Sequence, residues 1–236
     1  MYLDWTYIIL VMPAVIFSLL MSAAVNSSFK KYSSVFSKNG LTAAEAAMRV
    51  LSKNGVTGVR FERVAGNLTD HYDPRTNVIR LSDGVYDSTS IAAIGVACHE
   101  AGHAVQYAKG YAPIKIRAAI VPITNIGSKL SIPLIIIGIA LSYIGDVFTM
   151  IAYLGVALFG LCVVFQLVTL PTEFNASRRA IEGIRDCGIL SEQELAGAKK
   201  VLSAAAMTYV AALSVTIMQF LRLLIIVAGS DRRNRR

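Results

Sequence analysis

The stretch GVACHEAGHAVQY, residues 95–107, places two of the chain's three histidines four positions apart, with a glutamate directly after the first. Residues four apart lie on one face of a helix, so His99 and His103 can offer both imidazole rings to one metal ion. Glu100 points about 100° away and can instead reach a water molecule bound to that ion. Zinc in catalytic sites lowers the pKa of such a water toward about 7, and a neighbouring carboxylate can take its proton. The spacing therefore predicts a zinc-dependent peptidase with Glu100 as the general base.

The alternative interpretation of this motif is a set of polar residues on an ordinary core helix. The preceding run IAAIGVAC is apolar, and a buried glutamate with two histidines would be costly there without partners. A metal ion removes that cost, so we expect one bound Zn²⁺. Cys98 is disfavoured as a further ligand because neighbouring helix positions point about 100° apart.

A third ligand has to come from another part of the chain. Two predicted membrane crossings separate Glu173 from the motif helix, and an even number of crossings returns it to the same side. Asp146 follows a single crossing and would lie on the wrong side. Glu182 remains an alternative farther along the same segment, and Glu173 is the preferred ligand.

Composition favours a membrane protein with a modest water-facing domain. Hydrophobic residues make up 55% of the 236 residues and charged residues 16%, with a mean hydropathy of +0.56. The net charge of +8 does not form a basic stripe with interleaved aromatics, so we expect no nucleic-acid partner. Three separated cysteines without a CxxC pair predict no disulfide framework.

Apolar stretches divide the chain into five predicted segments. The first, 7–25, follows MYLDWT, which lacks the basic residues of a signal peptide, and so predicts an uncleaved anchor. The region 118–170 is too long for one span, and YIGD at 143–146 divides it into spans near 121–143 and 147–169, with Pro122 and Pro133 kinking or starting the first. Residues 204–229 form the last apolar stretch. The segments are an anchor (1–25), a water-facing zinc domain (26–117), a membrane hairpin (118–170), a Glu-ligand helix with a soluble segment (171–203), and a C-terminal membrane segment with a basic tail (204–236).

Within 26–117 the patterns predict a small α/β unit. Thr42 and Glu45 form a capping box that starts a helix ending before Gly55. VTGVRFERV alternates like a strand; TDHYDP indicates a turn, 77–81 a strand, and Asp83-Gly84 a second turn. The motif helix is expected to begin at Ser88 or Ser90 and to run to about Lys109, before Gly110. A second capping box pairs Ser191 with Glu194. The expected fold class is an α+β membrane protein, mostly helical, with about four membrane segments and a zinc domain carrying a short β-sheet.

These motifs together resemble a known family. HEAGH, then a membrane hairpin, then EFNAS is similar to the membrane-bound gluzincin metallopeptidases, the group of the HtpX heat-shock proteases and the CAAX prenyl proteases. DHYDP, VIRLS, HEAGHA and LPTEFNASRRA are closer to the neutral zinc metallopeptidases of the YugP type. The resemblance covers nearly the whole chain. It implies a gluzincin-like zinc domain in which His99, His103 and Glu173 bind zinc and Glu100 is the general base.

The resemblance also suggests supporting residues. Many gluzincins carry an aspartate four residues after the ligand glutamate; here that position is Ser177, whose hydroxyl can hold a histidine ring only more weakly. An edge strand beside the motif helix binds substrate in related peptidases, which points to Asn77, Val78, Ile79, Arg80 and Leu81. An ordinary sheet strand is the alternative. Candidates for stabilising the transition state are His71, Tyr72, Asn175 and Arg178, although His71 can equally be a loop histidine and Arg178 a headgroup anchor.

The positions of lysine and arginine predict the sidedness. Lys30, Lys31 and Lys38 follow the first span and Arg178, Arg179 and Arg185 follow the hairpin, which puts the N-terminus outside and the zinc domain in the cytoplasm of a bacterial-type cell. If 204–229 crosses, the basic tail ends outside, against this rule, so crossing and non-crossing both stay open. The expected partners are the lipid bilayer and a peptide or membrane-protein substrate.

Two functions remain in view at this point: a membrane-bound zinc endopeptidase, and a zinc-binding scaffold or holdase without turnover. The intact Glu100 favours the endopeptidase, since a scaffold needs no base. A transporter has little support, because the spans lack charged pairs at mid-depth apart from Arg222.

Overall fold

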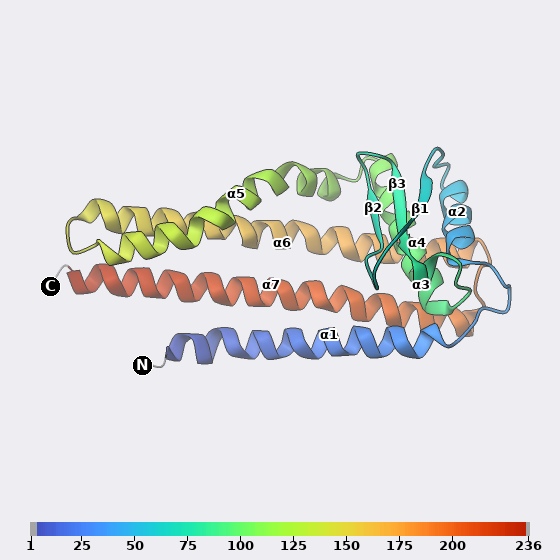
Figure 1. The fold of residues 1–236 in the computed structure, drawn as a ribbon, viewed down its shortest axis with the longest axis horizontal. Helices are drawn as coiled ribbons and strands as arrows, with labels where there is room; N and C mark the ends of the chain where they lie inside the picture. Colours follow the sequence, from blue (N-terminus) through green and yellow to red (C-terminus); the bar gives the residue numbers. More distant parts are fainter. Residues whose placement is uncertain (1–3, 235–236) are drawn as a thin grey trace. The chain divides into compact units, whose positions relative to one another are not determined.

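A computed structural model describes residues 4–234, which are mostly helical with one small sheet (Figure 1). A π-helical stretch at Tyr7–Val11 leads into the first helix. The helices are α1 (Met12–Ser33), α2 (Ala43–Lys53), α3 (Asp83–Tyr86), α4 (Ile91–Ala108), α5 (Ala112–Ala140), α6 (Asp146–Asp186) and α7 (Glu192–Asn234), and the strands are β1 (Arg60–Val64), β2 (His71–Asp73) and β3 (Val78–Ser82). The expected class, a mostly helical α+β membrane protein, is confirmed.

Within residues 4–234, four helices are long and apolar enough to cross a membrane: Tyr7–Ser33, α5, α6 and α7. The long apolar region between α4 and the C-terminal segments is divided at residues 141–145, as the YIGD stretch predicts. Pro122 and Pro133 both lie inside α5, so neither starts it. A helix of 41 residues, such as α6, is about twice as long as a bilayer core requires at 1.5 Å per residue.

Continuity of α6 corrects one expectation. Glu173 was expected to begin a new helical segment after the second hairpin span, but α6 runs unbroken from Asp146 to Asp186 through Pro171. A proline removes one backbone donor, which a long helix with packed neighbours can tolerate. Glu173 therefore lies on the same helix as the preceding apolar stretch.

The chain forms two compact units. One comprises Met1–Leu20, Ile116–Leu170 and Tyr209–Arg236. Its buried apolar cluster is small: Ile135, Ala152, Val156, Leu223 and Val227. Close backbone approach supplements this cluster, because a Cβ on Gly138 would lie 2.4 Å from the backbone nitrogen of Ala152. Small residues that admit such contacts are typical of helix packing in lipid.

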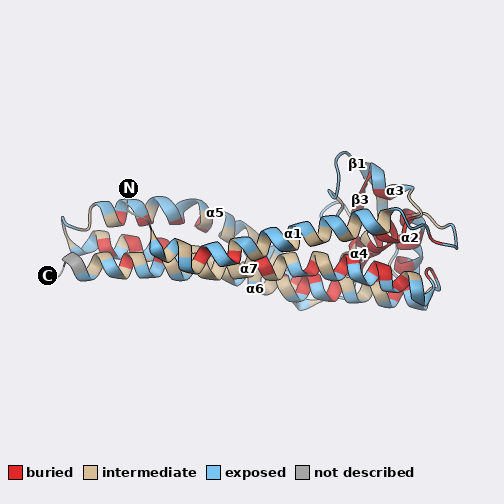
Figure 2. Cartoon of the chain, turned by 90° about the horizontal axis from the view of Figure 1, so that it is seen from below, coloured by how far each residue is buried: buried red, intermediate tan, exposed pale blue. Residues whose placement is uncertain are grey.

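The other unit comprises Met21–Lys115 and Pro171–Thr208 and has a much larger core. Figure 2 shows buried residues gathered on α2 and α4, and many of them are alanines, which let these helices pack closely. The predicted ends of both helices are confirmed: Thr42 and Glu45 form the capping box of α2, and the Ser90 hydroxyl accepts the Ala93 amide at the start of α4. Gly110, the predicted stop, has a φ of +68°.

The sheet differs from the expectation in three ways. Its order is β1-β3-β2, with β1 parallel and β2 antiparallel to β3. The stretch 77–81 therefore lies in the central strand, shifted by one residue to Val78–Ser82, and is not an edge. The two edge strands are β1 and β2, and β2 lies within the stretch that was expected to be only a turn. At Asp83-Gly84 the chain forms the short helix α3 instead of a turn.

Candidate metal centre

The two motif histidines lie one turn apart on α4 and are largely enclosed. Their side chains are 15% and 11% exposed, and the ring centroids are 4.8 Å apart with the planes nearly perpendicular. The apolar residues around them anchor α4 in the core of its unit. The packing of the helix thus fixes the backbone positions of both rings.

Glu173 reaches the same point from α6. One carboxylate oxygen, Oε2, lies 3.3 Å from Nε2 of His99 and 3.5 Å from Nε2 of His103, and the side chain is 2% exposed. One donor atom from each of the three residues lies within 4.8 Å of the others. The structure therefore brings together the two histidines and the preferred glutamate. Glu182 is exposed on a later turn and is not a member of this group.

The outward nitrogens of both rings have partners. Ser177 Oγ lies 3.1 Å from Nδ1 of His99, and Gln106 Oε1 lies 3.0 Å from Nδ1 of His103. Because the Gln106 oxygen can only accept, His103 donates an Nδ1 proton to it, and Nε2 faces Glu173. Partners of this kind fix the orientation of metal-binding imidazoles.

Gln106 was missed in the sequence, although it lies three residues after His103 on the same helix. It is fully buried, and its amide nitrogen donates to the Thr172 carbonyl at 2.8 Å and to Asn175 Oδ1 at 3.0 Å. Arg179 donates to the same Asn175 oxygen at 2.8 Å. Gln106 thus joins the His103 ring to the α6 turn that carries Glu173. The sequence signal that could have identified Gln106 is its spacing of three residues from His103 on the same helix.

The charged groups around His103 raise its pKa. Burial by itself lowers the pKa of His103, but its hydrogen bond with Glu173 and the charges of Glu100 and Glu173 raise it, and the net shift is upward. The surroundings therefore stabilise positive charge between the two helices.

Glu100 lies beside the donor group without being a member of it. Its side chain is buried, and Oε2 accepts the backbone amide of Tyr72 from β2 at 2.9 Å. This hydrogen bond fixes the carboxylate from outside its own helix. The edge strand therefore orients the residue that the motif predicts as the base.

Close contact of α4 with α6 depends on Gly102. A Cβ at this position would lie 2.6 Å from the carbonyl oxygen of Ala176, which is far inside van der Waals contact. The two backbones can approach so closely only because the residue is glycine. The missing side chain lets Glu173 reach the histidines.

The remaining predicted residues are engaged elsewhere or exposed. The Tyr72 hydroxyl donates to Asn77 Oδ1 at 2.9 Å, and burial raises the pKa of Tyr72. His71 is exposed, with Nδ1 2.8 Å from the Thr69 carbonyl. Arg178 is also exposed and lines a separate groove. Cys98 is fully buried next to His99 but is not in the donor group.

Comparison with known proteins gives two agreeing results. Residues 7–228 match the model of a family described as "Putative neutral zinc metallopeptidase". The chain belongs to this family of zinc metallopeptidases. It is also 44% identical over 232 residues to "Putative membrane protease YugP" of Bacillus subtilis (strain 168), covering 97% of this chain and 99% of that protein. No solved structure matches.

Membership in the family agrees with the donor set. Two imidazole nitrogens and one carboxylate oxygen are the ligands that zinc takes in catalytic sites that keep a position for water. The partners on both Nδ1 atoms leave both Nε2 atoms facing Glu173, as such an ion requires. Zinc is the cofactor that the family and the geometry share, and the four long apolar helices make the chain an integral membrane protein.

Proposed function

We propose that the chain is a membrane-bound endopeptidase that uses one zinc ion held by His99, His103 and Glu173. The observation that carries this proposal is the convergence of the three donor atoms within 4.8 Å, from two helices that Gly102 allows into close contact. Family membership supports the same conclusion.

Glu100 is the general base in this proposal. A bound zinc ion would lower the pKa of a water molecule and polarise the substrate carbonyl. Glu100 takes the proton of the attacking water and passes it to the leaving amine. One of its oxygens is occupied by the Tyr72 amide, so the carboxylate cannot rotate freely and its other oxygen is held in one direction.

Cleavage by the detergent-purified protein tests this assignment against a scaffold without turnover. Casein cleavage should stop with a chelator and return with zinc. Glu100→Gln should keep stoichiometric zinc but lose about 10²–10⁴-fold in rate, the usual contribution of a general base. Asp186→Asn, a matched loss of an exposed carboxylate near the end of α6, should cleave normally. If wild type and Glu100→Gln cleave equally, the activity does not belong to this site. A wild type that binds zinc and cleaves nothing would favour the scaffold.

The orientation in the membrane forms a second part of the proposal. The zinc-site residues lie on the cytoplasmic side, because basic residues follow the first span and the hairpin. Within the unit of long apolar helices, Arg222 Nε donates to Asp4 Oδ2 at 3.0 Å and the guanidinium lies over the Tyr7 ring. Asp4 precedes the first apolar stretch. Its contact with Arg222 supports a full crossing by α7, with the C-terminal tail on the side of the N-terminus.

Labelling a cysteine at Ser230 with an impermeant maleimide tests this topology in a variant whose three native cysteines are replaced. We expect labelling in intact cells, whereas Ser191→Cys should react only after the cells are opened. Labelling of Ser230→Cys only in opened cells would exclude an outside tail.

A further inference from the structure

A groove of about 430 Å³ lies between α6 and α7, within the unit that contains the metal centre. Five apolar side chains line it: Phe174, Ile181, Leu202, Ala206 and Met207. Phe174 is 45% exposed and Met207 36% exposed. Exposed apolar surface of this kind, rimmed by polar residues, is typical of a binding surface.

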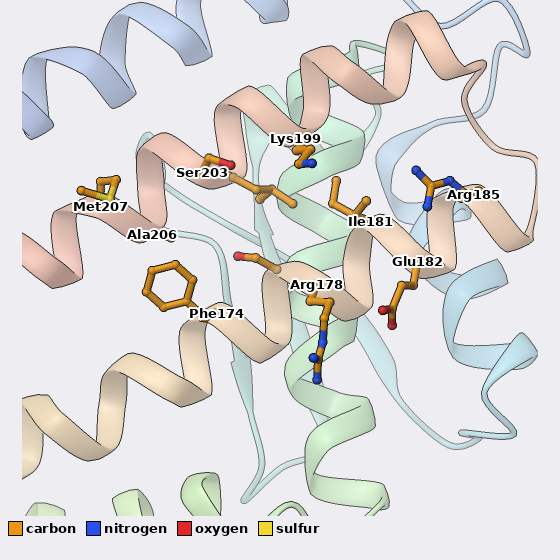
Figure 3. A pocket seen from close by; sticks show the side chains of 11 residues that line it. Phe174, Arg178, Ile181, Glu182, Arg185, Lys199, Ser203, Ala206 and Met207 are labelled. Atoms are coloured by element: carbon orange, nitrogen blue, oxygen red, sulfur yellow. The ribbon is translucent and has the colours of Figure 1, made fainter.

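Polarity changes along the groove. Figure 3 shows Phe174 and Met207 at one end and Arg185 at the other, with Lys199 between them on α7. The helices are antiparallel, so the apolar end lies nearest in sequence to the spans: Phe174 is four residues after Leu170, and Met207 is two residues before Tyr209. The groove is thus apolar toward the long apolar stretches of both helices and basic away from them.

The charged residues of the groove leave a positive excess. Three cations, Arg178, Arg185 and Lys199, accompany one carboxylate, Glu182. Arg185 donates to Glu192 at 3.2 Å. Among the described residues, Arg178 and Lys199 have no hydrogen bond or ion pair within the chain. An occupant with a negative head and an apolar tail would match both ends.

We propose that this groove binds an acidic phospholipid, with an acyl chain against Phe174 and Met207 and the phosphate near Lys199 and Arg185. Basic pockets next to membrane helices attract anionic headgroups, each cation near the surface contributing about 1 kcal/mol. A bilayer supplies this ligand at high local concentration beside the apolar end. Arg178, on the α6 rim, adds to the positive field.

The groove also adjoins the metal centre at Ser177. Ser177 lines the groove, and its hydroxyl contacts the ring of His99. An occupant therefore packs against the residue that orients one of the proposed zinc ligands. The lipid site itself does not depend on peptide hydrolysis.

Photo-crosslinking of the Glu100→Gln protein tests the proposal independently of activity. The protein in nonionic detergent is titrated with phosphatidylglycerol carrying a photoreactive acyl chain, or with the phosphatidylcholine analogue, and adducts are mapped by peptide mass spectrometry. We expect saturable adducts on the peptides containing Phe174 and Met207 with phosphatidylglycerol, and at least tenfold less with phosphatidylcholine.

Charge variants complete the test. Arg178→Gln combined with Lys199→Gln should weaken phosphatidylglycerol binding about thirtyfold, the equivalent of about 1 kcal/mol per cation. Arg49→Gln combined with Lys200→Gln removes the same charge from exposed positions outside the groove and should bind like the parent. Zinc content reports folding of all variants. Equal labelling by both lipids, equal loss in both double variants, or adducts confined to other helices would each overturn the proposal.

Discussion

The unit that contains the metal centre and the unit of long apolar helices bury their residues differently. The first has a large, alanine-rich core from α2, α4, the sheet and parts of α6 and α7, whereas the apolar cluster of the second contains five buried residues among those that the structure describes. In water a core must remove apolar surface from solvent, but a helix in lipid can leave it exposed. Precise side-chain geometry is therefore concentrated in the first unit, and changes in the two units should have separable consequences.

Removal of a proposed ligand should give the largest effect. Glu173→Ala leaves two imidazoles without their shared carboxylate, so we expect zinc affinity to fall by more than a hundredfold, beyond the 10–100-fold typical of residues that only support a ligand. Competition with a fluorescent chelator measures the affinity. Glu182→Ala, nine residues later on the same helix, should bind zinc normally, and an equal loss there would contradict the assignment of Glu173.

Two glycines test the separation of the units directly. Gly102→Ala would push a methyl group to 2.6 Å from the Ala176 carbonyl, and Gly138→Ala would place one 2.4 Å from the Ala152 backbone nitrogen. Overpacking of this kind costs about 1–3 kcal/mol, so both variants should unfold at lower temperature. Only Gly102→Ala should also lose zinc affinity, because it separates α4 from α6.

Gly95→Ala is the matched control for these glycines, since its Cβ would make an ordinary 3.5 Å contact with Ala198. Its melting temperature and zinc affinity should stay at or above those of the parent. Zinc loss in Gly138→Ala would show that the two units are coupled after all.

Removing the side chains that hold the histidine rings should have effects of intermediate size on zinc affinity. Gln106→Leu removes the acceptor of His103 Nδ1 and leaves Asn175 and the Thr172 carbonyl without its amide, so we expect zinc affinity to fall about 10–100-fold. Ser177→Ala should cost less, about tenfold, because a single hydroxyl contact is lost. Ser203→Ala, across the groove, should have no effect on zinc affinity.

The difference in reactivity between two cysteines should be the smallest of these effects. It reports only on the core of the unit that contains the metal centre. Burial raises the pKa of Cys98 far above its usual range, so its reactive thiolate is scarce at pH 8. Cys187 is only partly buried and should react with iodoacetamide first, as read by peptide mass spectrometry. Equal rates would indicate that the core around α4 opens readily.

The parts of the fold that the sequence predicts well are those that a short stretch of residues specifies by itself. Capping residues mark the ends of α2 and α4, and long apolar runs mark the candidate spans. Glu173 could be selected because two crossings return it to the side of His99. The three-residue strand β2 was missed because Asp70, Asp73 and Pro74 are turn residues and so short a strand has no visible alternation.

Other features depend on tertiary contacts that no local pattern contains. The central position of β3 follows from pairing on both sides, including a parallel partner that comes from earlier in the chain. The hydrogen bond from the Tyr72 amide to Glu100 joins two elements 28 residues apart. Gln106 was visible as a residue three positions after His103, but its role depends on its contacts with α6.

The division of the donor group between α4 and α6 has a consequence for synthesis. The 70 residues from His103 to Glu173 include α5 and the part of α6 that precedes Glu173. A ribosome adds them in about 4–14 s at roughly 5–20 residues per second. Throughout that interval the nascent chain has two histidines and the carboxylate of Glu100, but no third ligand. The order of translation therefore delays assembly of the donor group until both arms of the hairpin have been made.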